Sequence, residues 1–176
     1  CEVSFMTRDE FFDLMEPLFI ELTENVAGKT VMQKPFPRIP YKEVMETYGS
    51  DRPDLRFDLK ISDVTEWGKE TDFKVFQSAE HVRVLVVPGG HEFSRKEITD
   101  EFEDKAKRGH AKGLAWMKHV DGAFDGGIMK FFTETQLQQL KEQVSLSENS
   151  ILFFVADSWD VSCKALGVVR EYVGEK

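Results

Sequence analysis

Apolar residues recur at three- and four-residue spacing from residue 11 to residue 22, which predicts an amphipathic helix. Thr7 precedes this pattern and can cap the helix, and the acidic residues that follow it suit the helix dipole. Pro17 interrupts the pattern, so we expect a kink or a second helix start there. Gly28 marks the end of the helical stretch.

A proline-rich connector over residues 35–40 separates this helix from a short second one over residues 40–48, which Gly49 closes. Beyond residue 57 the pattern changes, and both the alternating residues 72–77 and the β-branched run 81–87 predict strands. The same criteria predict a helix over residues 94–108 with a capping box at its start, a strand over 113–120, a turn-rich loop over 121–127, a helix over 133–144, a central strand over 151–156 and a helix over 159–173.

This order of elements predicts an α+β fold. When the 133–144 helix is treated as an insertion, the order from residue 72 is β-β-α-β-β-α. Such an order predicts a two-layer sandwich, in which helices cover one face of an antiparallel sheet. We expect the domain boundary near residues 58–70, because the residues before it offer helices and a loop but no sheet to pack on.

Composition narrows the function classes. The chain has 176 residues and a net charge of −9, so it is not a globally basic nucleic-acid-binding protein. No apolar run approaches the roughly 20 residues of a membrane span, and two cysteines, Cys1 and Cys163, are too few for a disulfide framework. The four histidines have no metal-ligand spacing, so we predict no metal site. A start at Cys1 rather than Met predicts that upstream residues are missing.

One run of residues has a specific resemblance. Residues 48–57 read YGSDRPDLRF, which closely resembles the YGSDKPDLRF run of bacterial-type aspartyl-tRNA synthetases. Residues 35–45, before this run, and residues 111–116 and 152–157, after it, are similar to segments that the same family places in the same order. The resemblance therefore covers essentially the whole chain.

This resemblance implies two segments. In that family a class II catalytic domain is interrupted by an inserted α+β domain, called GAD after its Gly-Ala-Asp signature, with a DCoH-like arrangement. The resemblance assigns residues 1–62 to a partial catalytic-domain segment with a connector and residues 63–176 to the GAD insert domain. Here the signature reads Val155-Ala156-Asp157, so valine replaces the first glycine.

The resemblance also implies a function for the parent protein, an aspartate–tRNA ligase. Such an enzyme activates L-aspartate with ATP and Mg²⁺ and transfers it to tRNA, as a cytoplasmic homodimer with no membrane association. The class II motifs expected to bind ATP are absent from this chain, so we predict no catalytic residue and no cofactor bound here. The expected partners are tRNA and the remainder of the catalytic domain. The alternative is a non-catalytic binding module of a tRNA-dependent amidotransferase, which is not expected to contain the 48–57 run.

Two sets of residues are candidate sites. The first, which we call the junction loop, is residues 48–57; Ser50, Asp51, Arg52 and Asp54 in it could order the edge of an active site or nearby RNA, or could simply form a proline-restrained turn. The second is a basic run that could contact tRNA phosphates, or could be a solvated helix end whose cations suit the dipole. Its members are Lys105, Lys107, Arg108, Lys112 and Lys118, with His110 between them and His119 directly after Lys118.

Overall fold

The fold was analysed in a computed structural model, which describes residues 2–176; Cys1 lies outside the described residues. The chain divides into two compact units, Cys1–Ile39 and Pro40–Lys176. The second unit therefore begins before the boundary expected near residues 58–70. The assignment of residues 1–62 to a catalytic-domain segment stays a prediction.

The first unit is built around a single long helix, α1 (Arg8–Glu21). Thr7 caps it as predicted, in a capping box with Glu10. Pro17 lies inside the helix, which continues through it, so no second helix begins there. A π-helical turn, Leu22–Val26, extends α1, and Gly28 follows in the left-handed conformation with φ of 63°.

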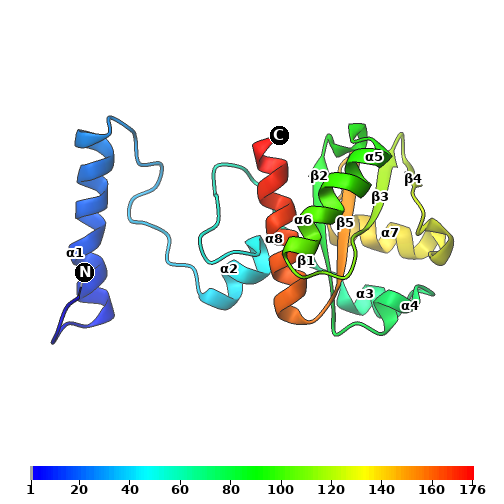
Figure 1. The fold of residues 1–176 in the computed structure, drawn as a ribbon, viewed down its shortest axis with the longest axis horizontal. Helices are drawn as coiled ribbons and strands as arrows, with labels where there is room; N and C mark the ends of the chain where they lie inside the picture. Colours follow the sequence, from blue (N-terminus) through cyan, green and yellow to red (C-terminus); the bar gives the residue numbers. More distant parts are fainter. Residues whose placement is uncertain (1) are drawn as a thin grey trace. The chain divides into compact units, whose positions relative to one another are not determined.

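The second unit contains one five-stranded antiparallel sheet in the order β1-β2-β5-β3-β4 (Figure 1). The strands are β1 (Ile61–Asp63), β2 (His81–Pro88), β3 (Ala115–Val120), β4 (Ala123–Asp125) and β5 (Ser150–Asp157). β5 occupies the centre and pairs with β2 along its whole length, from His81 opposite Asp157 to Pro88 opposite Ser150. The predicted α+β class with an antiparallel sheet is confirmed.

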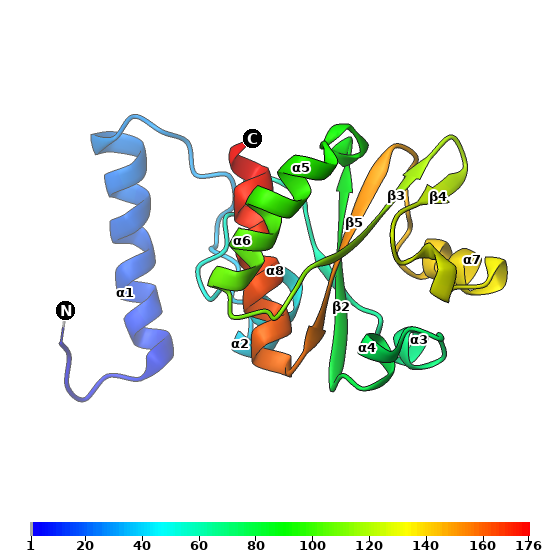
Figure 2. The ribbon, with the colours of Figure 1, turned by 45° about the vertical axis from the view of Figure 1, so that its right-hand side comes forward.

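Helices cover both faces of this sheet, as Figure 2 shows. One core contains Phe153 of β5 with Phe102 and Leu166 from the helices on its side. The other contains Phe154 of β5 with Phe76 and Leu140. The helices of the second unit are α2 (Tyr41–Tyr48), α3 (Thr65–Lys69), α4 (Lys74–Gln77), α5 (Arg95–Glu97), α6 (Glu103–Arg108), α7 (Glu134–Gln143) and α8 (Trp159–Glu175), with a π-helical turn Ile98–Phe102 and 3₁₀ turns Gly90–Glu92 and Met129–Phe131.

The structure differs from the predicted two-layer arrangement because α3, α4 and α7 form a further layer on the second face. The helix set aside as an insertion is α7, and its Leu137 and Leu140 belong to that core. Leu137 and Leu140 are three residues apart and therefore lie on one side of α7, the side that packs in this core, so α7 is a structural layer.

The strand predicted over residues 72–77 is wrong, because residues 74–77 form helix α4. Phe73 and Phe76 both pack in the aromatic cluster, whereas Val75 is exposed. The spacing of three between Phe73 and Phe76 matches a helical turn, whereas Phe73 and Val75 alternate as in a strand, so this short run fits both patterns. The short strands β1 and β4 were not predicted; β1 lies at the expected boundary, and β4 lies in the expected loop.

Candidate functional site

The junction loop begins where α2 ends. Gly49 takes the left-handed conformation at φ of 72°, and its N–H donates to the carbonyl of Met45, as the predicted helix end requires. The hydroxyl oxygen of Ser50 then accepts a hydrogen bond of 3.2 Å from the backbone N–H of Arg52. Arg52 and Asp51 are exposed. The first half of the loop is therefore a local turn with two charged side chains directed to solvent.

An ion pair fixes the second half of the loop. The Asp54 carboxylate accepts a 2.9 Å hydrogen bond from the backbone N–H of Arg56 and further bonds from its guanidinium. These bonds, the side-chain ones first, lower the pKa of Asp54 to about 2. Arg56 remains largely exposed, so Asp54 sets the direction of its guanidinium without covering it.

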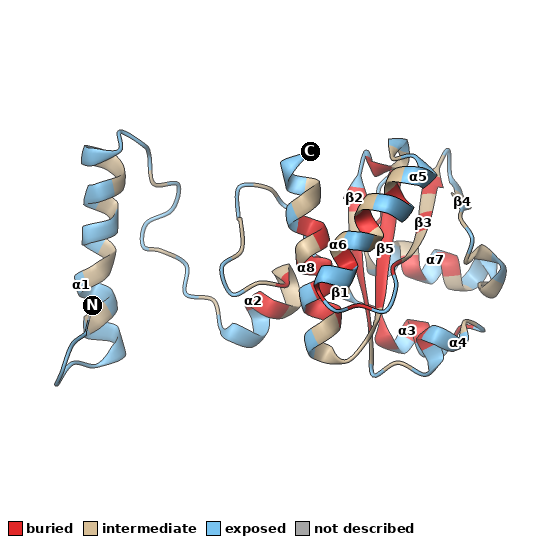
Figure 3. Cartoon of the chain, in the orientation of Figure 1, coloured by how far each residue is buried: buried red, intermediate tan, exposed pale blue. Residues whose placement is uncertain are grey.

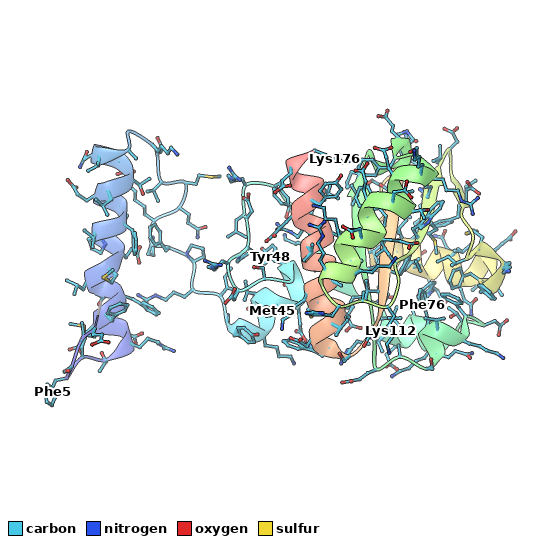
Figure 4. The ribbon with its side chains drawn as sticks, viewed as in Figure 1. Phe5, Met45, Tyr48, Phe76, Lys112 and Lys176 are labelled. Carbon is cyan, nitrogen blue, oxygen red and sulfur yellow. The ribbon has the colours of Figure 1, made fainter. Side chains whose placement is uncertain are left out.

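The loop is bound to α8 through Arg170, which is not among the candidate residues predicted from the sequence. The guanidinium donates to three backbone carbonyls, those of Leu59 at 2.5 Å, Asp54 at 2.7 Å and Phe57 at 3.2 Å. Its Cζ atom also lies 4.3 Å from the ring centroid of Phe57 and 4.9 Å from that of Tyr48. Burial lowers the pKa of Arg170 from its usual value. Figure 4 shows Tyr48 at the end of α2, next to α8.

Two glycines of α8 allow the loop to approach closely. A Cβ atom on Gly167 would lie 2.5 Å from the carbonyl oxygen of Gly49, and one on Gly174 would lie 2.3 Å from the ring of Phe57. Neither distance is compatible with a side chain unless something moves. A pocket of about 380 Å³ opens beside this contact, and Arg52, Arg56, Glu171 and Glu175 contribute charged groups to its lining.

A second buried cation joins α2 to the sheet. Arg83 on β2 lies 3.4 Å from carboxylate oxygens of both Glu46 and Asp63 and is only 2% exposed. Glu46 also accepts a 2.9 Å hydrogen bond from the indole N–H of Trp159. These bonds explain why α2 belongs to the second unit, although the sequence predicts a domain boundary after α2, near residues 58–70.

The basic run is only partly assembled. Lys105, Lys107 and Arg108 lie on α6, and Lys112 lies in the loop after it. Lys107 is 3.5 Å from Glu103, and Arg108 is 2.8 Å from Asp104, which are the favourable i,i+4 pairs. Lys112 is 92% exposed, and its amine is 3.8 Å from Asp157. This part forms one cationic end of α6.

Lys118 does not join that group. It lies on β3 opposite Ile151, whereas Lys112 lies by Asp157 at the other end of β5. Its amine donates to the carbonyls of His91 at 2.7 Å and Phe93 at 2.6 Å. Lys118 is thus engaged in holding the turn after β2.

The residues at the signature position have structural contacts. Val155 is buried in β5, and Asp157 ends that strand. One oxygen of the Asp157 carboxylate accepts a 2.8 Å hydrogen bond from the N–H of Ser158, which precedes α8. Within residues 2–176, no group of three or more His, Cys, Asp or Glu side chains could hold a metal ion. In the same range, no helix has the length and apolarity to cross a membrane.

Comparison with protein families shows which family this chain belongs to. The family described as "GAD domain" matches residues 74–166, which is more than half of the chain. The chain belongs to the GAD domain family. The match begins at α4 and ends within α8, so the central strands of the sheet belong to the GAD domain.

Similarity to known proteins extends beyond the GAD domain. The chain is 42% identical over 176 residues to an aspartate–tRNA ligase of Streptococcus equi subsp. zooepidemicus and 43% identical to one of Lactococcus lactis subsp. cremoris strain SK11. It is 38% identical over 178 residues to an aspartate–tRNA(Asp/Asn) ligase of Chlorobium phaeobacteroides. Each alignment covers 99% of this chain but only 29–30% of the relative. The resemblance to aspartyl-tRNA synthetases is confirmed.

Sequence reasoning missed Arg170, although a signal was present. Helical spacing places Arg170 on the same side of α8 as Leu166 and Val173, both of which pack in the core. A cation at an apolar position needs buried partners. The junction loop, which contains Pro53 and two aspartates, could have been considered as the source of those partners.

Proposed function

We propose that this chain is a segment of an aspartate–tRNA ligase and joins part of its catalytic domain to the GAD domain. The alignment over 99% of the chain supports this best, because it includes residues 1–73, before the GAD match. The junction loop lies in that earlier part and binds α8 through Arg170. The complete ligase activates aspartate with ATP and Mg²⁺ and transfers it to tRNA in the cytoplasm, as a homodimer.

The amidotransferase alternative accounts for less. A GAD domain from an amidotransferase would explain residues 74–166, but it would leave the similarity of residues 1–73 unexplained. We therefore propose the ligase and assign the chain a structural role within it. The residues that activate aspartate are expected in other parts of the ligase, so the chain alone has no ligase activity.

A chimera tests this function. The matching segment of the Lactococcus lactis ligase would be replaced by this chain, and aspartylation of tRNA would be measured with purified enzyme. We expect charging to persist, because a homologous segment preserves the contacts on both sides. A folded chimera without charging would contradict the proposal. The isolated chain is the negative control, and aspartate-dependent ATP–pyrophosphate exchange by it would contradict the structural role.

We also propose that the cationic end of α6 contacts tRNA. Lys107 and Lys112 are exposed, and cations that bind phosphates release counterions, so binding would weaken steeply as salt rises. In the chimera, Lys107→Glu with Lys112→Glu should raise the Kd for tRNA and flatten its salt dependence. Lys74→Glu, on α4 at the other face of the sheet, is the matched control. An unchanged Kd for the double variant would leave α6 a solvated helix end.

A further inference from the structure

Arg170 is the most deeply buried cation among the described residues of the second unit, with 0% of its surface exposed. Within residues 2–176 no carboxylate lies at hydrogen-bond distance from it; its acceptors are the backbone carbonyls of Asp54, Phe57 and Leu59. Backbone carbonyls keep these positions only while residues 54–59 hold one conformation. The hydrogen bonds of this cation therefore depend on the backbone conformation of residues 54–59.

The dependence also runs in the opposite direction. A buried cation without partners is strongly unfavourable, because it has lost its water and has gained no compensating group. The Nη1 atom of Arg170 already has no hydrogen-bond partner in the described residues. Its Nε and Nη2 atoms donate to the carbonyls of residues 54–59, so displacement of these residues would leave the whole guanidinium without partners. Residues 54–59 are thus bound to α8 by three hydrogen bonds from one guanidinium.

The surrounding contacts favour the same single conformation. Gly167, Arg170 and Gly174 lie at spacings of three and four on α8, and therefore on one side of the helix. They contact the loop at Gly49, at its carbonyls and at Phe57, respectively. Because the loop meets α8 at three successive turns, it cannot pivot about a single contact.

The exposed side of the loop fits a protein neighbour better than RNA. Arg52 and Arg56 are near Asp54, Glu171 and Glu175, so the lining of the pocket has two cationic and three anionic side chains. Such a mixed surface gives phosphates little net attraction. Ordered charges of both signs instead suit contacts with other polar protein groups.

We propose that Arg170 is a positioning residue, which fixes the junction loop on α8 so that the loop orders the adjoining part of the catalytic domain. The proposal rests on the proposed ligase function. Arg170 acts through the loop and touches no substrate. Its loss should therefore lower the turnover of aspartate activation while the affinity for tRNA persists.

Hydrogen exchange in the isolated chain tests the first half of this proposal. In Arg170→Met, amides of residues 49–60 should exchange at least about tenfold faster, while those of β2 and β5 keep their protection. Arg170→Lys retains the charge but not the planar donor geometry, so it should have an intermediate effect. Unchanged exchange in the loop, or equal loss of protection across the sheet, would overturn the proposal.

Gly167→Ala separates loop position from the loss of a buried charge. The added methyl group would collide with Gly49 while Arg170 remains intact, so the same loop amides should become exposed. This variant also serves if Arg170→Met fails to fold. Lys164→Met, on the exposed side of α8 and paired only with Asp160, is the matched control and should change nothing.

Kinetics in the chimera test the second half. Arg170→Met and Gly167→Ala should lower kcat for aspartate-dependent ATP–pyrophosphate exchange by roughly ten- to a hundred-fold, because small displacements of positioned groups have effects of this size even when the substitution is far from the chemistry. The KM for tRNA should stay within about twofold. Full turnover despite an open loop, or a rise in the tRNA KM alone, would overturn the positioning role. An inactive unmodified chimera would instead contradict the ligase function, and the exchange data would still decide the loop contact.

Discussion

The two units use the same local signals but differ in burial. α1 in the first unit and α7 in the second both begin with a threonine capping box, Thr7 with Glu10 and Thr133 with Gln136. None of residues 2–39, however, is buried, whereas the second unit has apolar clusters on both faces of its sheet (Figure 3). Capping determines where a helix begins, but tertiary burial supplies most of its stability. The comparison predicts that equivalent substitutions have unequal effects.

Phenylalanine truncation should give the largest difference. Phe102 has 0% exposure and stacks on Phe153, so Phe102→Ala should lower the free energy of unfolding by about 3–5 kcal/mol. Phe19 is 51% exposed, and Phe19→Ala should change the free energy of unfolding by less than about 0.5 kcal/mol. Urea unfolding followed by tryptophan fluorescence measures the effect of each variant on the second unit, which contains all three tryptophans. Equal shifts would break the comparison.

A glycine pair tests how tightly the second unit is packed. A Cβ atom on Gly109 would lie 2.3 Å from the Cα atom of Ala165 on α8, so Gly109→Ala should cost about 1–3 kcal/mol. Gly113, four residues later, has no atom within 4 Å of the same position, and Gly113→Ala is the control. Thermal unfolding should show a lower Tm for the first variant only. A neutral Gly109→Ala would mean that α6 and α8 can separate at little cost.

Replacement of the two capping threonines by alanine should change different observables. Thr133→Ala should lower the free energy of unfolding of the second unit by about 1 kcal/mol, because α7 belongs to its core. Thr7→Ala should reduce helical circular dichroism without moving that transition, because α1 has no buried residue. A shift of the main transition by Thr7→Ala would contradict the separation of the units.

The smallest effect is expected at the surface of the junction loop. The bonds from Arg56 lower the pKa of Asp54 from its usual 3.8 to about 2, so they give the loop stability that is present above about pH 4. That contribution is lost as the pH falls from about 4 through 2. Arg56→Gln should raise the pKa of Asp54 toward 3.8 in a carboxyl NMR titration, and Arg52→Gln should not. An unchanged pKa in Arg56→Gln would mean that the ion pair does not order the loop.

The fold was predictable where many residues repeat one signal. The element type was predicted correctly for β5 from its apolar run and for α8 from its helical spacing of apolar residues. Helix starts were predicted correctly at the capping residues Thr7, Ser94 and Thr133. α4 and β4 were missed because three or four residues contain too little periodicity to separate helix from strand or turn.

The candidate site was less predictable than the fold. Residues 48–57 were selected by resemblance, but the resemblance did not reveal what holds them. Arg170 lies more than a hundred residues from Asp54, and pairing at such a distance leaves no local pattern. The separation of Lys118 from Lys112 likewise follows from strand register, which neighbouring residues in the sequence do not reveal.

Both outer strands of the sheet, β1 and β4, are only three residues long. Long outer strands present rows of free N–H and C=O groups to which another chain can add, and they are a frequent origin of aggregates. With so few such groups on its outermost strands, the sheet offers little template for addition. The second unit should therefore stay monodisperse when it is produced alone, which light scattering on residues 40–176 can check.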